Sequence, residues 1–187
     1  MTRMTLNATL ASTMNRITAR WMIRTLGGLN DGYGGKMEKK IKPVLMSLHP
    51  KWIELILQGK KTREVRKRAP LQRMPFKVYL YCTKEPEAWM AGIEGKYESY
   101  QMNGNVCGEA TCVSIVEYRG EFGTHGTCLS MERLKEYAGE KDTLCYMALE
   151  NPVMYEQPKG IAEFGLERAP QSWCYITDLN DGKGTHE

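Results

Sequence analysis

The residues best suited to chemistry in this chain lie between Gly59 and Arg66, where four cations surround one carboxylate, Glu64. If residues 61–66 are extended, Glu64 and Arg66 project from the same face, because side chains alternate along a strand. The Arg66 cation would then favour the charged form of the Glu64 carboxylate. Lys61 falls on the opposite face unless the strand begins after it, in which case it can turn back toward Glu64.

A plainer interpretation of this charged stretch remains open. It can be a solvated strand whose surface ion pairs each contribute about 0–1 kcal/mol to stability. The two interpretations differ in whether the charges converge on one site, so the elements around the stretch matter.

Apolar spacing predicts the elements that position the charged stretch. A short apolar strand over residues 44–48 precedes Pro50, which is tolerated in the first turn of a helix. Gly59 stands where a left-handed residue commonly ends a helix. The apolar residues between them recur at helical spacing and form one buried face: Trp52, Ile53, Ile56, Leu57.

The rest of the chain shows further short strands and little helix. Strands are predicted over residues 62–66, 76–82, 106–118, 144–149 and 173–176, and Ser130 is a plausible N-cap for a helix through Tyr137. Along residues 76–82 alternation places Tyr79 and Tyr81 on one face and the apolar residues on the other. Gly108 allows a bulge or a close approach. Five to six strands with two or three short helices predict a mixed α/β (α+β) fold, a small β-barrel.

Charge divides the 187 residues into a basic leader and a neutral body. Residues 1–36 hold five cations and one anion, whereas the remainder holds equal numbers of cations and anions. We interpret residues 1–36 as a disordered basic leader or the product of a mis-assigned start, with Met37 as the alternative start, and residues 37–187 as the domain. A neutral body argues against coating of duplex nucleic acid by bulk electrostatics. No apolar run approaches the about 18 residues needed to span a bilayer.

Six cysteines and three histidines show neither a Cys-x-x-Cys pair nor another zinc-ligand spacing. We therefore predict free, mostly buried thiols in a reducing cytoplasm, with no metal cluster and no cofactor.

The charged stretch also carries a family resemblance. Gly59-x-Lys61-x-x-Glu64-x-Arg66 resembles the Gly-x-Lys-x-x-Glu-x-Arg motif of the ASCH domains, members of the PUA-like superfamily. The context resembles the family too, since a strand ending in Ser47-Leu-His-Pro50 and a helix with Trp52 precede the motif. The resemblance covers roughly residues 42–177 and implies a compact PUA-like β-barrel with a cleft beside the motif.

For ligand binding, the resemblance implies a cleft that receives RNA or a nucleotide-like ligand, lined by Lys61, Glu64 and Arg66. A lysine or arginine can bind phosphate or a base carbonyl, and a carboxylate can accept from an exocyclic amine. Arg63 of the same charged run is a further candidate ligand. Tyr81 and Trp52 are candidates for a surface on which a base stacks, and Tyr79 and Trp173 are alternatives.

Two other functions remain open. One ASCH subfamily resembles an amidohydrolase that acts on N4-acetylcytidine, and another branch a ribonuclease; for an enzyme, Lys61, Glu64 and Glu109 are the catalytic candidates. Glu64 stands where the amidohydrolases have a threonine, so it would act as a general base on water, with Lys61 as electrophile. The third possibility is a protein-interaction module that uses the Tyr- and Met-containing residues 97–102.

Overall fold

The structure, a computed structural model, describes residues 40–84 and 102–177. The predicted leader, residues 1–36, and most of the proposed interaction patch, residues 97–101, lie outside the described residues. Met102, the last residue of that patch, is buried in the core.

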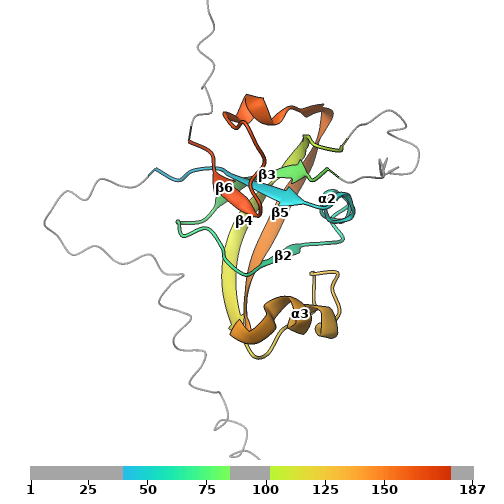
Figure 1. The fold of residues 1–187 in the computed structure, drawn as a ribbon, viewed down its shortest axis with the longest axis vertical. Helices are drawn as coiled ribbons and strands as arrows, with labels where there is room; N and C mark the ends of the chain where they lie inside the picture. Colours follow the sequence, from blue (N-terminus) through green and yellow to red (C-terminus); the bar gives the residue numbers. More distant parts are fainter. Residues whose placement is uncertain (1–39, 85–101, 178–187) are drawn as a thin grey trace, which may run out of the picture. The chain divides into compact units, whose positions relative to one another are not determined.

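The described residues form one six-stranded sheet with two α-helices and two short 3-10 helices (Figure 1). In chain order the elements are β1 (Val44–Leu48), α2 (Pro50–Leu57), β2 (Arg63–Arg66), β3 (Phe76–Cys82), β4 (Val106–Arg119), α3 (Met131–Ala138), η1 (Gly139–Lys141), β5 (Thr143–Lys159), η2 (Ile161–Phe164) and β6 (Trp173–Tyr175).

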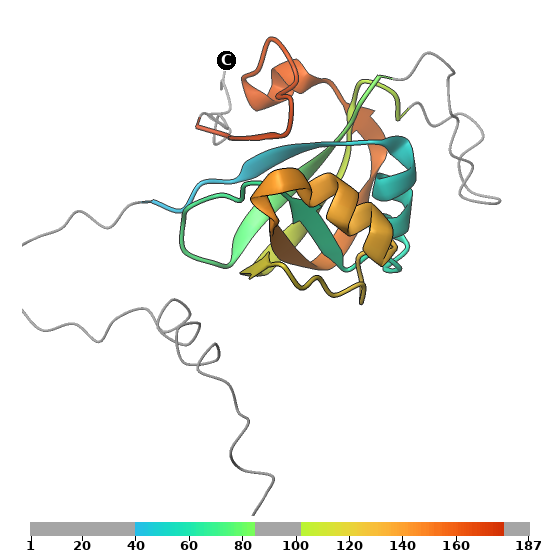
Figure 2. The ribbon, with the colours of Figure 1, turned by 60° about the horizontal axis from the view of Figure 1, so that its bottom comes forward.

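The strand order in the sheet is β2-β5-β4-β3-β1-β6. Strands β1 and β3 are parallel, and the other neighbouring pairs are antiparallel. The sheet curls into a half-barrel (Figures 1 and 2). The predicted mixed α/β (α+β) fold of five to six strands with two or three short helices is therefore confirmed.

Side-chain alternation gives the sheet two apolar faces. We call the face that packs against α2 the inner face; there Ile53 and Ile56 of α2 contact Val78, Leu80 and other fully buried residues. The outer face carries one cluster under η2 and another under α3 (Figure 2). The predicted alternation along β3 is confirmed, because Tyr79 and Tyr81 belong to the cluster under η2.

The helix ends follow from local sequence. Gly59 adopts a φ of 71°, as expected for the residue that ends α2. Ser130 caps α3, since its side chain accepts a hydrogen bond from the Arg133 backbone N–H.

Strand β5 is longer than the sequence predicts. The expected strand, residues 144–149, continues to Lys159 past Pro152 and Pro158. Strand β2 pairs with β5 only over residues 145–148, so the continuation pairs with β4 along one edge only. Proline is tolerated where a strand has an unpaired edge, and this is why turn-forming residues did not end β5.

None of the six cysteines forms a disulfide, and four of them are buried. Within the described ranges, no helix is long and apolar enough to cross a membrane. Residues 40–84 and 102–177 contain no group of three or more His, Cys, Asp or Glu side chains that could hold a metal ion.

Candidate functional site

The turn after α2 places Lys61 on the same face as Glu64. The backbone N–H groups of Lys60 and Lys61 both donate to the Leu55 carbonyl, so the chain folds back against the end of the helix. Strand β2 then begins at Arg63, after Lys61. Of the two possibilities that the sequence left open for Lys61, the structure therefore has the one in which it turns back.

Lys61, Glu64 and Arg66 form a buried ion cluster on the inner face. Glu64 pairs in register with Met147 of the inner core, which fixes the direction of its carboxylate. Lys61 Nζ lies 3.2 Å from Glu64 Oε2, and Arg66 Nε lies 2.8 Å from Glu64 Oε1. The exposed fractions of the Lys61 and Glu64 side chains are only 2% and 7%, which excludes the interpretation as solvated surface pairs.

The Lys61 ammonium has a protein partner for each of its three N–H bonds. Besides the Glu64 carboxylate, it donates to the backbone carbonyls of Thr127, at 2.7 Å, and Arg63, at 3.0 Å. An ammonium has three donors and no acceptor, so this set uses its whole hydrogen-bonding capacity. Lys61 is therefore placed to fix the Glu64 carboxylate rather than to bind a ligand directly.

Arg66 joins the two edges of the curled sheet. Its Nη2 donates to the Ser47 carbonyl of β1 at 2.7 Å, and its Nη1 donates to Ser172 Oγ, just before β6, at 3.3 Å. Strand β2 is at one edge of the sheet and β6 at the other, so this side chain spans the open side of the half-barrel. A guanidinium has five N–H donors in a planar fork, and these contacts leave donors available.

Trp52 of α2 lies beside the ion cluster. Lys61 Nζ is 5.2 Å from the centroid of the Trp52 ring, within the range of a cation–π interaction. The Trp52 side chain is half-buried, so part of it is accessible to solvent. The structure thus brings four predicted residues together: Trp52, Lys61, Glu64 and Arg66.

The other two predicted ligand residues lie away from this cluster. Arg63 pairs in register with Ala148, so its side chain leaves β2 on the outer face, opposite to Glu64. Tyr81 is 5% exposed and packs in the cluster under η2, also on the outer face. The structure therefore places the Tyr81 ring in the core of the outer face and does not bring it to the ion cluster.

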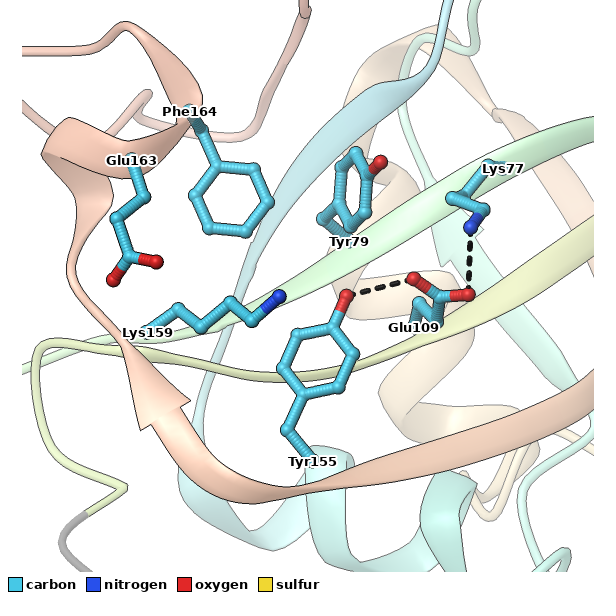
Figure 3. A pocket seen from close by; sticks show the side chains of 7 residues that line it. All are labelled: Lys77, Tyr79, Glu109, Tyr155, Lys159, Glu163 and Phe164. Atoms are coloured by element: carbon cyan, nitrogen blue, oxygen red, sulfur yellow. Dashed lines mark hydrogen bonds and ion pairs between the residues drawn. The ribbon is translucent and has the colours of Figure 1, made fainter. Parts of the chain in front are cut away.

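Glu109, the third catalytic candidate, also lies on the outer face. It pairs in register with Tyr79, whereas its neighbour Ala110 belongs to the inner core. Its carboxylate accepts hydrogen bonds from Lys77 Nζ and the Tyr155 hydroxyl, each at 2.7 Å (Figure 3). The structure thus does not bring Lys61, Glu64 and Glu109 to one site.

The surroundings of Glu109 shift its pKa in opposite directions. Burial raises the pKa, but hydrogen bonds from Lys77 and Tyr155 and the charges of Lys77 and Lys159 lower it, and the net pKa lies below the ordinary value. The hydrogen bond to Glu109 raises the pKa of Lys77 in turn.

We predict that Glu109 titrates below its ordinary pKa of 4.5. Because the pKa of Glu109 is lower in the folded chain than in the unfolded chain, its charged form stabilises the fold at pH values above the unfolded pKa. This contribution is lost as the pH falls through the folded pKa. In the double variant Lys77→Met/Tyr155→Phe the midpoint should rise, because burial remains while both hydrogen bonds are gone. Carbon-13 NMR of the side-chain carboxyl measures the midpoint, and an unchanged value in the double variant would contradict the stated cause.

Three residues that contact the ion cluster could not have been predicted from the sequence. Thr127 and Ser47 contribute backbone carbonyls to the cluster, and any residue type has a carbonyl. Ser172 contributes its hydroxyl from 106 residues away from Arg66. No sequence signal distinguishes these three positions.

Comparison with known proteins supports the fold. No family model matches the chain, and no curated protein matches it by sequence. The ASCH protein of Zymomonas mobilis superimposes with a TM-score of 0.55 at 20% identity, covering 73% of this chain and 88% of that protein. A serine-to-alanine mutant of the same protein gives 0.58 at 18% identity, covering 74% and 90%, and a tyrosine-to-phenylalanine mutant gives 0.56 at 19%, covering 74% and 92%.

These similarities define the class of fold. The six-stranded curled sheet with its helices has the α+β fold of the Zymomonas mobilis ASCH protein, the fold that the resemblance of residues 59–66 implies. At this level of identity the similarity extends to the fold alone.

Proposed function

We propose that this chain is an ASCH-type module that binds single-stranded RNA or a nucleotide-like ligand beside Trp52, Glu64 and Arg66. The observation that carries the proposal is the buried ion cluster next to a half-buried tryptophan. Burying two cations with one carboxylate is costly, and a well-packed apolar replacement is often as stable or more so. A role in binding therefore explains such a cluster more easily than a role in stability does.

Each residue has a distinct role in the proposed site. Arg66 retains N–H donors and can bind a phosphate or a base carbonyl. Glu64, whose carboxylate oxygens can each accept more than one hydrogen bond, can accept from an exocyclic amine. Trp52 offers a ring on which a base can stack, an interaction worth about 1–3 kcal/mol per base. Lys61 is the positioning residue that holds Glu64 in place.

The loop between β2 and β3 supplies charge for the phosphate backbone. Lys67, Arg68 and Arg73 are exposed, and no acidic residue occurs between Arg66 and Phe76. This loop is attached beside the ion cluster, since Trp173 Nε1 donates to the Arg68 carbonyl. A local basic loop on a neutral body suits one strand of nucleic acid better than bulk coating of a duplex.

Binding is favoured over the amidohydrolase and ribonuclease alternatives. The trio proposed for catalysis is divided between the two faces of the sheet, because Glu109 is directed away from Lys61. The donors of Lys61 are also occupied, so it is poorly placed as an electrophile. A test for release of cytidine from N4-acetylcytidine is expected to be negative.

Titration of a labelled single-stranded 12-nucleotide RNA by fluorescence anisotropy tests the proposal. We expect Arg66→Gln to weaken binding about tenfold or more, because a hydrogen bond to a charged group contributes about 1.5–3 kcal/mol. Thermal unfolding of the same variant shows whether the fold is retained. Wild-type affinity in a folded Arg66→Gln protein would remove the cluster from the binding site.

A charge-matched pair of triple variants tests the loop separately. Replacing Lys67, Arg68 and Arg73 by glutamine should reduce the slope of log K against log salt by about 2, since each phosphate contact contributes about 0.7 for single strands. The control makes the same replacement at three exposed cations elsewhere: Arg119, Arg133, Lys141. Equal effects of the two triple variants would contradict a role for the loop.

A further inference from the structure

The loop between β2 and β3 carries an aliphatic side chain at its tip. Leu71 is 85% exposed, more than any other large apolar residue of the described ranges, and Ile41 is 41% exposed. The loop lies beside the segment that leads into β1 (Figures 1 and 2). The proposed function uses the cations of this loop but neither of these aliphatic side chains.

Hydrogen bonds fix the backbone on both sides of the Leu71 side chain. The Leu71 N–H donates to the Tyr175 hydroxyl at 2.9 Å. The Gln72 side chain donates to the Lys42 carbonyl at 2.8 Å and accepts from the Lys42 N–H at 3.0 Å, which places Ile41 next to the loop. A single exposed leucine is common in folded proteins, so the groups around it decide what it can bind.

The segments around Leu71 are cationic. Residues 40–42 and 67–73, which we call the basic apolar tip, contain no acidic residue. Because residues 37–187 hold equal numbers of cations and anions, this positive charge is a local excess. It favours a partner with negative charge. All five cations of the tip are exposed: Lys40, Lys42, Lys67, Arg68, Arg73.

An anionic lipid bilayer suits this combination better than RNA or a protein does. RNA bases stack on aromatic rings and on guanidinium planes, and an aliphatic side chain offers neither. A specific protein interface buries about 800 Å² on each partner around a packed apolar core, and two aliphatic side chains among cations do not form one. A bilayer requires no matching pocket, because aliphatic groups enter the boundary of headgroups and acyl chains while cations remain with the anionic headgroups.

We propose that the basic apolar tip binds peripherally to membranes that contain anionic lipids. Leu71 inserts at the level of the headgroups with Ile41 beside it, and the lysines and arginines of the tip pair with the phosphate and carboxylate groups of the lipids. Peripheral binding of this kind needs no membrane-spanning helix. The tip shares the cations of the loop with the proposed RNA site, whereas Leu71, Lys40 and Lys42 serve lipid binding alone.

Co-sedimentation of the full-length protein with phosphatidylcholine vesicles that contain about 30% phosphatidylserine tests the proposal. We expect binding to these vesicles, weaker binding at higher salt, and little binding to pure phosphatidylcholine, because the cations require anionic lipid. Leu71→Gln should lower the affinity about tenfold, since the aliphatic side chain no longer leaves water. Leu71→Trp should retain the wild-type affinity, because tryptophan is favoured at membrane interfaces. The matched control is Val153→Gln on β5, where the apolar side chain is 52% exposed outside the tip.

A pair of double variants tests the charges of the tip without changing the loop. Lys40→Gln/Lys42→Gln should lower the affinity for the anionic vesicles about tenfold or more, since each cation near such a surface contributes to binding. Arg119→Gln/Lys141→Gln removes two exposed cations elsewhere and should change the affinity about twofold at most.

Titration of the labelled single-stranded RNA separates lipid binding from the proposed function. Leu71→Gln should bind the RNA with wild-type affinity, so the two proposals can fail independently. Absence of binding to the phosphatidylserine vesicles would overturn the proposal, as would equal effects of Leu71→Gln and Val153→Gln. Loss of RNA affinity in Leu71→Gln would assign this side chain to RNA and overturn the proposal as well.

Discussion

Replacing Glu64 by glutamine should lower the free energy of unfolding by about 3–5 kcal/mol. The substitution keeps the size of the side chain but leaves the Lys61 ammonium and the Arg66 guanidinium without their counterion, in a site where the Lys61 side chain is only 2% exposed. For a chain of this length, the melting temperature should fall by roughly 6–20 °C. Thermal and urea unfolding measure the change.

An exposed ion pair of the same chain provides the control. On α3, Arg133 Nη1 lies 2.6 Å from Glu136 Oε2, and the two side chains are 66% and 68% exposed. Glu136→Gln should therefore change stability by only about 0–1 kcal/mol. If Glu64→Gln had as small an effect as Glu136→Gln, the ion cluster would not contribute to stability as its burial indicates.

A double variant distinguishes the cost of losing the Lys61–Glu64 ion pair from the cost of leaving one buried charge without its partner. In Lys61→Met/Glu64→Gln one buried cation is removed together with the carboxylate. We expect its loss of stability to be smaller than the sum of the two single losses, because each single variant leaves a buried charge without its partner. Strict additivity would show that the two side chains are not coupled.

Replacing Gly108 by valine should destabilise the fold by about 3 kcal/mol or more. A Cβ at this position would meet the carbonyl oxygen of Val153 and lie 3.2 Å from Leu57 Cδ2. The backbone of β5 would have to move, because the contact is with a main-chain atom and not with the end of a flexible side chain. The β4–β5 pairing also shifts register next to Gly108.

Gly123→Val is the matched control for this prediction. A Cβ at Gly123 has no neighbour within 4 Å among the described residues, and the residue lies in an exposed loop. We expect a change within about 0.5 kcal/mol, as is usual for surface substitutions. If both valine variants unfold at the same urea concentration, the close approach of β4 and β5 at Gly108 is not a constraint on the fold.

The variant Arg66→Gln can separate two roles of Arg66. Arg66 connects the edges of the half-barrel and is also the proposed ligand contact. Loss of RNA binding in a variant with nearly wild-type stability would assign Arg66 mainly to the ligand, whereas loss of both would assign it mainly to closure of the sheet. Measuring stability and affinity on the same preparation is therefore essential.

Local sequence was sufficient where the physical cause is local. Gly59 ends α2 because a left-handed residue is needed there, and Ser130 caps α3 because its side chain can reach the Arg133 N–H. The alternation along β3 placed Tyr79 and Tyr81 on one face because successive side chains of a strand point in opposite directions. The neighbourhood of Glu64 and Arg66 followed from the same rule.

The tertiary structure decided what depends on contacts between distant segments. Helix α2 covers the inner face of the curled sheet and η2 covers the outer face, and for this reason Glu109 and Tyr81 lie away from Lys61. The Thr127 carbonyl determined that Lys61 has no free donor, and Ser47 and Ser172 determined where Arg66 reaches. Sequence by itself therefore defined the charged stretch, its preceding helix and the class of fold, because those follow from neighbours along the chain. Only folding showed which of the charges meet, because strand pairing and curl bring together residues that no local pattern connects.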